Sequence, residues 1–407
     1  MSVQPAQHQP SLARPEDLDE LQTCLEQADA LRRRRDFQQS LKFSERARQI
    51  DRNNIHALYL TGWNLVDLGR VAEARPIADR AIALSPGHPQ LHWLRGFILL
   101  LQGEYEQGWA EYESRWHIDE MGLGKNRYAQ PQWRGEDLHG KTILLHPEQG
   151  MGDSIQFCRY VELVRQRGPA KVLLATPPEL ERLFARSMPG IQLVRDREAI
   201  PNFDFHCPLM SLPLALRTTL ATVPSRVPYL HADEAEVERW RKRLSSHPGR
   251  KIGLVWSGGT LSVQNITRSM PLVMMNGLAG IEGVTFVSLQ KGPPAEEVAQ
   301  VPELKLLDWT AEFKDMSDTA ALICALDQVI TVCTSVSHLS GALARPTWTL
   351  LAYAADFRWM LDRSDSPWYP TMRLFRQTAL GDWETVIARV RQELEADFNV
   401  TRASRPC

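Results

Sequence analysis

The stretch TILLHPEQGMGDSIQFCRYVELV, residues 142–164, contains the sharpest change of pattern in the chain. The apolar run TILLH leads into a turn with two glycines, Gly150 and Gly152, and then into Asp153 and a helical pattern that we predict from Ser154 onward. A strand, a glycine turn and a helix in this order are typical of one unit of a parallel α/β sheet. Such a turn can cradle a phosphate, cap its helix, or present a carboxylate to a cleft.

The same alternation continues beyond this stretch. The further runs that we predict as strands are KVLLA, IQLV, FDFHCP, KIGLVW, GVTFVSLQ, VITV and TWTLLAY, most of them separated by helical patterns. Alternation of this kind predicts parallel sheets wound through right-handed crossovers. Because it breaks near residues 230–250, we predict two doubly wound lobes, residues 141–240 and 241–378, followed by a C-terminal helix and tail over 379–407.

A repeat of 34 residues precedes these lobes. Ala28, Gly62 and Gly96 share one column of it, other columns hold leucine or small residues, and Pro86 closes the second unit. Small residues at this period, where paired helices would cross, resemble about three tetratricopeptide repeats over residues 21–116. Two roles stay open for such an array: a packing or oligomerisation module, and a groove that binds a peptide.

The segments on either side of the repeats lack periodicity. Residues 1–20 are polar and contain proline, so we predict a disordered lead-in rather than a signal peptide. Residues 117–140 mix glycine, proline and charge, and we predict a linker laid over the next domain and anchored by Trp133.

The bulk properties exclude several classes of protein. The 407 residues carry a formal net charge of −2, which gives no broad electrostatic footprint for nucleic acid. Six scattered cysteines without a CxxC pair argue against a zinc site or a disulfide framework. No run of 18 apolar residues is present, so we predict a cytoplasmic protein without a transmembrane segment.

Ligands of doubly wound sheets bind where the strands end and helix N-termini point their free N–H groups. In the first such loop, Ile155 occupies the place of the third glycine of a dinucleotide-binding turn, which disfavours NAD. Asp153 in the same loop is either a helix N-cap or a general base, and one carboxylate can fill both roles.

Two further loops offer groups for an anionic ligand, and ordinary structural roles remain open for each of them. Arg268 follows a glycine-bearing loop and could pair with a diphosphate or with a surface carboxylate. The candidate residues in these loops are Ser257, Gly258, Arg268, Ser288, Gln290 and Lys291.

The fourth loop carries the strongest signal. A buried strand, VITV, ends at Cys333, and a helix rich in small and hydroxyl residues follows. Thr334, Ser335 and the free N–H groups at the helix start could hold a pyrophosphate. His338 lies one turn further along, where it could donate to that anion or serve as a structural histidine.

Several blocks of this sequence carry a family resemblance, among them EQGMGDSIQFCRYV, NITRSMPL, VSLQKG and TAALICALDQVITVCTSVSHLSGALARP. The chain resembles, over about residues 25–395, bacterial proteins that join tetratricopeptide repeats to a glycosyltransferase family 9 domain. That resemblance implies the heptosyltransferase-like GT-B fold and an inverting, metal-independent transfer from a nucleoside-diphosphate sugar, without a further cofactor. It also implies a donor on the C-terminal lobe and an acceptor that enters from the N-terminal side.

Carried over by position, the resemblance implies that Asp153 is the catalytic base and that Thr334, Ser335 and His338 hold the donor diphosphate. Ser257 and Gly258 would approach the phosphates, and Arg268 would replace a lysine of the family. The chain departs from the family at Cys333, where many members have an aspartate that touches the donor sugar. A thiol cannot accept hydrogen bonds as a carboxylate does, so this departure implies a different sugar or an impaired site.

We therefore predict a glycosyltransferase that uses a nucleotide-sugar donor, with a protein or peptide acceptor recruited by the repeats. Two alternatives stand beside it: a non-catalytic scaffold with a degenerate GT-B domain, and an epimerase that acts on nucleotide sugars. A homo-oligomer is compatible with either role of the repeats.

Overall fold

The structure is a computed structural model and describes residues 14–123, 127–195, 200–259 and 265–403. The chain divides into two compact units, Met1–Ile98 and Leu99–Cys407. Each unit has its own packing and is described by itself.

The first unit is all-helical. Its helices are α1 (Pro15–Arg33), α2 (Phe37–Ile50), α3 (Ile55–Asp67), α4 (Val71–Leu84) and the greater part of α5 (Pro89–Gln102). Helices α1 to α4 pack in chain order, and the hydroxyl of Ser40 in α2 donates to the carbonyl of Ala28 in α1 at 2.7 Å. Gly62 is required where α3 meets α5, since a Cβ there would lie 2.6 Å from Cδ2 of Leu94.

The starts of the helices follow the period seen in the sequence. Helices α2, α4 and α6 (Tyr105–Tyr112) begin at Phe37, Val71 and Tyr105, at intervals of 34 residues. The expected boundaries differ at both ends of this region. Helix α1 begins at Pro15, inside the predicted lead-in, because Glu16 and Asp17 favour a helix start; the first thirteen residues lie outside the described part. The division between the units falls within α5, ahead of the predicted boundary at 116.

Helix α6 packs into the second unit. The ring of Tyr105 in α6 stacks on that of Trp368 with centroids 6.0 Å apart. Trp109 of the same helix contacts Phe357 edge-to-face, with centroids 5.6 Å apart. Aromatic contacts of this kind add to the burial of apolar area. The last helix of the periodic region is therefore part of the α/β unit.

The first sheet of this unit has four parallel strands in the order β3-β2-β1-β4. The strands are β1 (Thr142–His146), β2 (Lys171–Thr176), β3 (Gln192–Arg195) and β4 (Phe205–Pro208), and the helices are α7 (Met151–Phe157), α8 (Tyr160–Arg165), α9 (Glu181–Ser187) and α10 (Leu212–Ala215). The central strands are apolar and buried, as parallel strands covered on both faces are.

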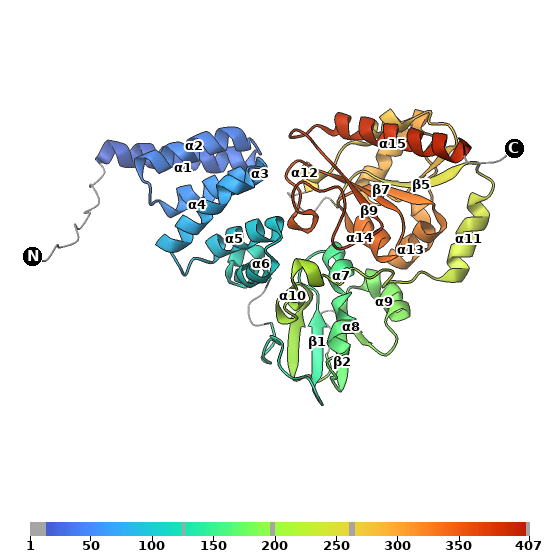
Figure 1. Ribbon diagram of the computed structural model, residues 1–407, viewed down its shortest axis with the longest axis horizontal. Coiled ribbons are helices and arrows are strands. Elements are labelled where there is room, and N and C mark those ends of the chain that lie inside the picture. Colours follow the sequence, from blue (N-terminus) through green and yellow to red (C-terminus); the bar gives the residue numbers. More distant parts are fainter. Residues whose placement is uncertain (1–13, 124–126, 196–199, 260–264, 404–407) are drawn as a thin grey trace, which may run out of the picture. The chain divides into compact units, whose positions relative to one another are not determined.

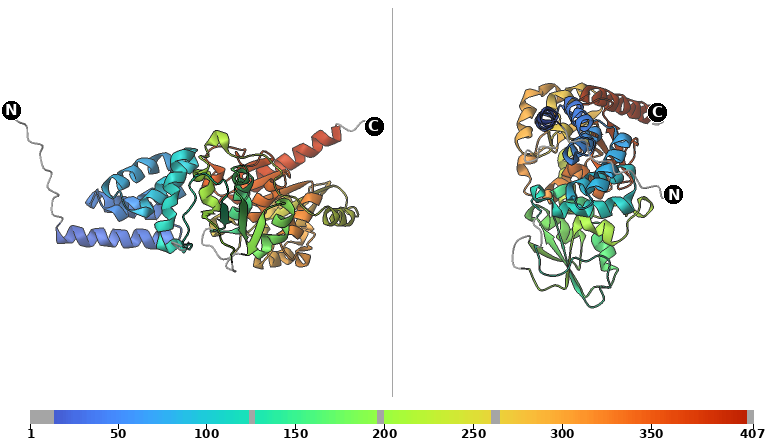
Figure 2. Two further views of the ribbon diagram at one scale, coloured as in Figure 1. Left: turned by 90° about the horizontal axis from the view of Figure 1, so that it is seen from below. Right: turned by 90° about the vertical axis from the view of Figure 1, so that its left-hand side faces the viewer.

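The second sheet has five parallel strands in the order β6-β5-β7-β8-β9. The strands are β5 (Arg250–Val255), β6 (Val284–Ser288), β7 (Gln328–Val332), β8 (Thr347–Leu351) and β9 (Met372–Arg376), and the helices are α11 (Glu234–Leu244), α12 (Asn265–Arg268), α13 (Met316–Ala325), α14 (Ser335–Ala342) and α15 (Trp383–Ala403). Helix α15 covers one face through Val386 and Ile387, and α13 and α14 lie on the other face (Figures 1 and 2).

Helix α11 belongs to the second lobe. It packs against α13, and its Trp240 stacks with Trp309 at 5.6 Å. The change of lobe thus comes before α11, ahead of the boundary that we predicted at residue 240. Within residues 117–140, Trp133 is 1% exposed and its Nε1 donates to the carbonyl of Glu136.

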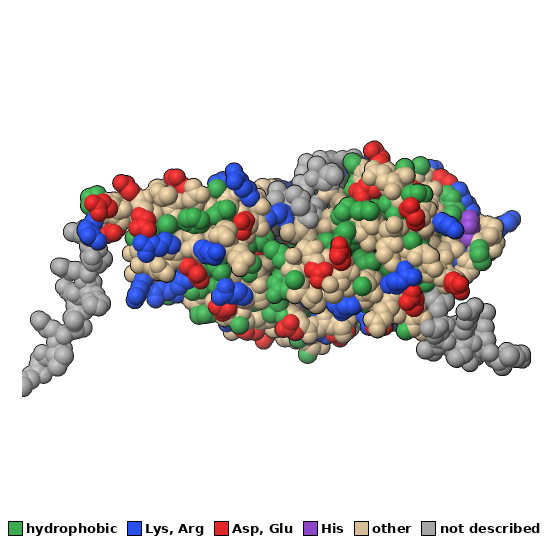
Figure 3. All heavy atoms as spheres, turned by 90° about the horizontal axis from the view of Figure 1, so that it is seen from above, with side chains coloured by type: hydrophobic (Ala, Val, Ile, Leu, Met, Phe, Trp, Pro, Cys, Tyr) green, Lys and Arg blue, Asp and Glu red, His purple; other side chains and the backbone are tan. Residues whose placement is uncertain are grey.

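The surface carries charges of both signs. Figure 3 shows basic and acidic side chains interspersed over the face that it presents. In the described part of the chain, no helix combines the length and the apolar character needed to cross a membrane.

Candidate active site

Asp153 lies in the first turn of α7, at the carboxyl end of β1. The helix begins at Met151, three residues earlier than predicted, and Gly150 is its N-cap. Asp153 is therefore the third helical residue rather than the N-cap, and its Oδ2 accepts the N–H of Gly150 at 2.9 Å. A carboxylate at this place satisfies one donor at the helix start and benefits from the helix dipole.

Gly152 lets α7 approach α14. A Cβ on Gly152 would lie 3.0 Å from Cδ2 of His338 and 3.5 Å from Cα of Ser335. The two glycines of the turn thus have separate roles, one as helix cap and one as the point of contact between the lobes.

Asp153 is ion-paired with Arg358, a residue that sequence analysis did not identify. The Nη2 of Arg358 donates to Oδ1 of Asp153, Nη1 donates to Asp356 at 2.7 Å, and Nε donates to Gln156 at 2.7 Å. The Arg358 side chain is 7% exposed and that of Asp153 20%. All three directions of the guanidinium are thus in use, which fixes the position of the carboxylate.

Burial and charge act on Asp153 in opposite directions. Burial raises the pKa of Asp153 above its ordinary value, while the positive charge of Arg358 lowers it. The charge of Arg268 also lowers the pKa of Asp153, which indicates that this arginine lies on the same side of the site. A partly exposed carboxylate with a raised pKa is suited to accept a proton from a bound hydroxyl.

The start of α14 faces this carboxylate across Gly152. Thr334 is the N-cap residue of α14, is 8% exposed, and makes no capping bond through its side chain. Its hydroxyl lies 3.3 Å from that of Thr331, and Ser335 is half-buried. The first N–H groups of an α-helix have no partner within the helix, so this end is suited to an anion.

His338 belongs to α14 and is buried where this helix packs against α7. Its Nδ1 lies 2.9 Å from the hydroxyl of Tyr369, and its ring stacks with that of Trp359 at 5.4 Å between centroids. Burial lowers the pKa of His338 well below its ordinary value, and nearby arginines lower it further. His338 is thus a neutral imidazole in a fixed position.

Cys333 is buried where β7 ends. Its Sγ accepts a hydrogen bond from Nε1 of Trp359 at 3.1 Å, and burial raises the pKa of its thiol. The charge of Arg268 lowers the pKa of Cys333, as it does that of Asp153. Cys333, Asp153 and Arg268 therefore lie within one electrostatic neighbourhood.

The loop after β5 is tied down by Gln290. The side-chain Oε1 of Gln290 accepts the main-chain N–H of Trp256 at 3.2 Å and that of Ser257 at 2.9 Å. The main-chain N–H of Gln290 donates to the hydroxyl of Ser288. Gln290 and Ser288 are 3% and 0% exposed. The structure gives both side chains a supporting role behind the loop, and neither of them is exposed at the surface of the site.

The other two candidates in this region, Gly258 and Lys291, differ in their hydrogen-bond partners. The N–H of Gly258 donates to the hydroxyl of Ser269 at 3.0 Å, which places the loop beside Arg268. The ammonium of Lys291 instead donates to the carbonyl of Phe313 at 2.7 Å. The structure thus joins Gly258 to Ser269, the residue that follows Arg268, and engages Lys291 elsewhere.

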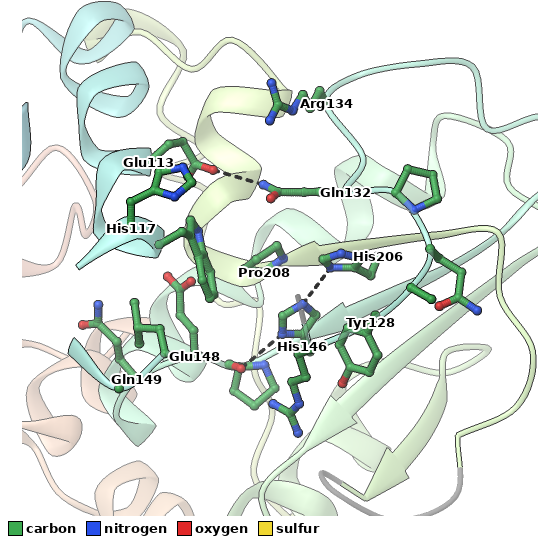
Figure 4. A pocket seen from close by; sticks show the side chains of 18 of the residues that line it. Glu113, His117, Tyr128, Gln132, Arg134, His146, Glu148, Gln149, His206 and Pro208 are labelled. Carbon is green, nitrogen blue, oxygen red and sulfur yellow. Dashed lines mark hydrogen bonds between the residues drawn. The ribbon is translucent and has the colours of Figure 1, made fainter. Parts of the chain in front are cut away.

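A pocket of about 570 Å³ opens beside the start of α7 (Figure 4). Its walls come from the ends of β1 and β4 and from the segment between α6 and β1. The side chains that line it include Glu113, Trp116, His117, Tyr128, Gln132, Arg134, His146, Glu148, Gln149 and His206. Gln149 immediately precedes Gly150, whose N–H binds Asp153, so one wall of the pocket leads into the turn that positions the carboxylate.

Arg115 supports one wall of this pocket. It is fully buried, pairs with both oxygens of Glu148 at 3.0 and 2.9 Å, and donates to Glu113 at 2.6 Å. The hydroxyl of Ser211 donates to Glu113, and that carboxylate also accepts from Gln132 at 3.0 Å. Burial raises the pKa of Glu148, and Arg115 opposes this effect.

Two imidazoles form the floor. Nε2 of His146 lies 3.1 Å from Nδ1 of His206, and Tyr128 meets both rings at centroid distances of 5.1 and 5.2 Å. Burial lowers the pKa of His146 to about 3 and also lowers that of His206. Both imidazoles are therefore neutral at pH 7.

This pair predicts a dependence of stability on pH. The folded pKa of His146 lies below the ordinary value of about 6.5, so the unfolded chain binds more protons below that pH. Stability is therefore lost as the pH falls, by about 1 kcal/mol for one such histidine between pH 7 and 5.5. Urea unfolding measures the free energy of unfolding at pH 7 and at pH 5.5. Between these pH values, the free energy of unfolding of His146→Gln should fall by about 1 kcal/mol less than that of the wild type. Equal losses in the two proteins would contradict the assignment.

No known protein-family profile matches this chain. The chain is similar to Protein FlbA of Caulobacter vibrioides, with 31% identity over 361 residues, which cover 82% of this chain and 60% of FlbA. The chain thus spans about three fifths of the length of that relative.

Two solved structures are similar in fold. The glycosyl transferase family 9 protein from Veillonella parvula covers 65% of this chain with 98% of its own, at 13% identity and a TM-score of 0.50. The ADP-heptose lipopolysaccharide heptosyltransferase II of E. coli covers 63% with 98% of its own, at 16% identity and a TM-score of 0.48. The fold prediction is confirmed: the chain has a GT-B-like pair of parallel α/β lobes preceded by an all-helical region.

Proposed function

We propose that this protein is an inverting glycosyltransferase that moves a sugar from a nucleoside-diphosphate sugar to an acceptor hydroxyl, with Asp153 as the base. The observation that carries the proposal is the meeting of α7 and α14 at Gly152. There, a partly exposed carboxylate with a raised pKa faces a helix start and the charge of Arg268. The fold shared with a family 9 glycosyl transferase supports it.

The chemistry needs a base on one side and an anion site on the other. The acceptor oxygen forms a bond to the anomeric carbon while the bond from that carbon to the diphosphate oxygen breaks. The acceptor proton passes to Asp153, and the departing diphosphate takes the electron pair. Attack from the face opposite to the leaving group inverts the anomeric centre.

The remaining site residues have roles that follow from their places. The N–H groups at the start of α14, with Thr334 and Ser335, would bind the diphosphate, and Arg268 would neutralise the charge that develops on it. His338 stays neutral and would donate a hydrogen bond without adding charge. These groups stabilise the leaving group by themselves, so the proposed reaction needs no metal and no further cofactor.

The nature of residue 333 affects which donor sugar can bind, rather than how the diphosphate is held. Its thiol is buried and already accepts a hydrogen bond from Trp359. A weak acceptor that is already occupied cannot bind sugar hydroxyls as a carboxylate would. We therefore propose that the donor sugar differs from the heptose of the heptosyltransferases.

The helical region supports a protein or peptide acceptor. Its helices recur at the 34-residue interval of tetratricopeptide repeats, and stacked repeats of this kind offer extended binding surfaces. The five described cysteines are free, which suits a reducing compartment, and we place the reaction in the cytoplasm.

The test is a panel of nucleotides and nucleotide sugars, measured by thermal shift in the presence of EDTA. Saturation with the matching UDP, ADP or GDP compound is expected to raise the melting temperature by about 4 °C or more. Arg268→Ala should lose most of this shift, because the variant lacks the cation for the diphosphate. Arg373→Ala is the control, since that arginine pairs with Glu393 on the surface. A shift with none of these compounds would support a scaffold that kept the fold and lost the donor.

A further inference from the structure

The loop after β8 approaches the candidate site from the second lobe. Strand β8 ends at Leu351, and a short 3-10 helix over Phe357–Trp359 follows. Asp356 is the N-cap of this helix, and its C=O accepts the N–H of Trp359 at 3.0 Å. Because β7 and β8 pair in parallel, the loops at their carboxyl ends meet at one edge of the sheet. The loop after β8 therefore lies beside the loop that leads into α14.

Two side chains of this short helix fix its position. Nε1 of Trp359 donates to Sγ of Cys333 at 3.1 Å, and the ring of Trp359 stacks on that of His338. The guanidinium of Arg358 donates to the carboxylate of Asp153. Both Trp359 and Arg358 are buried. The segment thus contacts the start of α14 with one side chain and the proposed base with another.

A single guanidinium joins the carboxylates of Asp356 and Asp153. Nη1 of Arg358 donates to Oδ1 of Asp356 at 2.7 Å, and Nη2 donates to Oδ1 of Asp153. The two carboxylates, one from each lobe, are therefore separated only by the terminal nitrogens of one planar group. Burial is the main cause of the raised pKa of Asp153 and of Cys333, and the negative charge of Asp356 raises both further, in agreement with this placement.

Asp356 has a carboxylate oxygen to spare. Its Oδ1 accepts both Nη1 and the main-chain N–H of Arg358, at 2.7 and 3.0 Å. Within the residues that the structure describes, Oδ2 of Asp356 accepts no hydrogen bond. The Asp356 side chain is 35% exposed, whereas that of Arg358 is 7% exposed. A buried cation thus holds one oxygen of a partly exposed carboxylate and leaves the other available to a ligand.

The proposed reaction places a sugar hydroxyl near this oxygen. Asp153 takes the proton of the hydroxyl that attacks the anomeric carbon, so the anomeric carbon lies close to Asp153. The groups next to that carbon are the ring oxygen and the hydroxyl of the second carbon, and of these only the hydroxyl can donate a hydrogen bond. The thiol of Cys333 is a weak acceptor that Trp359 already occupies. A carboxylate of the second lobe beside the base is suited to bind that hydroxyl.

We propose that Asp356 determines the sugar specificity of the donor site by accepting a hydrogen bond from the hydroxyl on the second carbon of the donor sugar. It supplies, from the end of β8, the sugar-binding carboxylate that Cys333 does not supply at the end of β7. The donor is accordingly a nucleoside-diphosphate sugar with a free hydroxyl on its second carbon. This inference names the donor class of the proposed function and rests on it.

The test measures dissociation constants by calorimetry, with the full chain in EDTA. The three ligands are the nucleoside diphosphate found in the panel, its sugar form, and the 2-deoxy-2-fluoro analogue of that sugar form, whose fluorine cannot donate a hydrogen bond. Asp356→Ala removes the proposed contact. Asp356→Asn removes the charge and keeps an oxygen for the N–H of Arg358. Asp365→Ala is the matched control, because Asp365 also pairs with an arginine two residues away, Arg363, and is largely exposed.

In the wild type and in Asp365→Ala, the fluoro analogue should bind about tenfold more weakly than the parent sugar nucleotide, or weaker still, since it loses a bond to a charged group. In Asp356→Ala, the parent should bind as weakly as the analogue, within about threefold. The nucleoside diphosphate alone should bind equally well to all four proteins, because it has no sugar. A merely structural role of Asp356 at the start of the short helix would leave the difference between parent and analogue intact.

The outcomes separate this inference from the proposed function. Equal binding of parent and analogue by the wild type, or an undiminished difference in Asp356→Ala, would overturn the role of Asp356 and leave the glycosyltransferase standing. If Asp356→Ala fails to fold, Asp356→Asn decides: a difference reduced at least about threefold supports the contact, and an unchanged difference overturns it. Absence of binding by every nucleotide would count against the proposed function and, with it, against Asp356 as a donor-binding residue.

Discussion

Asp153→Asn is expected to lower kcat by about a thousandfold and to leave the nucleotide thermal shift unchanged. The carboxylate is the proposed base, and loss of a positioned general base costs two to four orders of magnitude in rate, roughly. The amide oxygen can still accept the N–H of Gly150, so the capping bond of α7 is kept, whereas the ion pair with Arg358 is lost and the protein is expected to be less stable. The proposed nucleotide site lies at the start of α14, on the other lobe, and has no need of the carboxylate.

The rate is measured in EDTA as hydrolysis of the donor found in the panel, with water as the acceptor. Glu162→Gln is the control, because it makes the same chemical change on an exposed carboxylate that pairs with Arg165 on α8. A kcat within about threefold of wild type for Asp153→Asn would reduce Asp153 to a structural residue of the helix start.

Much of the α/β frame follows from local pattern. Apolar runs such as TILLH and VITV could be recognised as strands because buried parallel strands are apolar on both faces. Helix α7 begins three residues before the predicted start, because glycine is a poor helix former and Gly152 therefore argues against a helix. Here Gly150 serves as cap and Gly152 as a contact with His338, and neither role is visible in propensity.

Other features depend on contacts between distant parts of the chain. Arg358 lies in a loop, 205 residues from Asp153, and nothing in its own neighbourhood marks it as a partner of the base. The short pairing of Gln132 with His206 of β4 could not be predicted, because Pro131 argues against a strand, although an edge position tolerates proline. The lobe to which α11 belongs is decided by Trp240 and its packing, which the break in alternation could not reveal.

Arg358→Gln is expected to destabilise the fold and to shift the pH dependence of the reaction. The substitution leaves Asp153 without its cation in a partly buried site and also removes the partner of Asp356. Removal of one member of a buried ion pair costs about 3–5 kcal/mol. Loss of the positive charge raises the pKa of Asp153 further, because burial then acts without opposition.

The sign of the kinetic effect follows from the role of a base, which acts in its ionised form. A higher pKa moves the acid limb of the kcat profile to higher pH, and the profile between pH 5 and 9 measures this shift. Arg358→Lys keeps the positive charge and loses the guanidinium that donates in three directions. The acid limb of its pH profile should therefore lie between those of the wild type and Arg358→Gln. Arg363→Gln is the control, since its partner Asp365 is largely exposed. A lower rate with an unmoved acid limb would mean that Arg358 supports the fold without setting the protonation of Asp153.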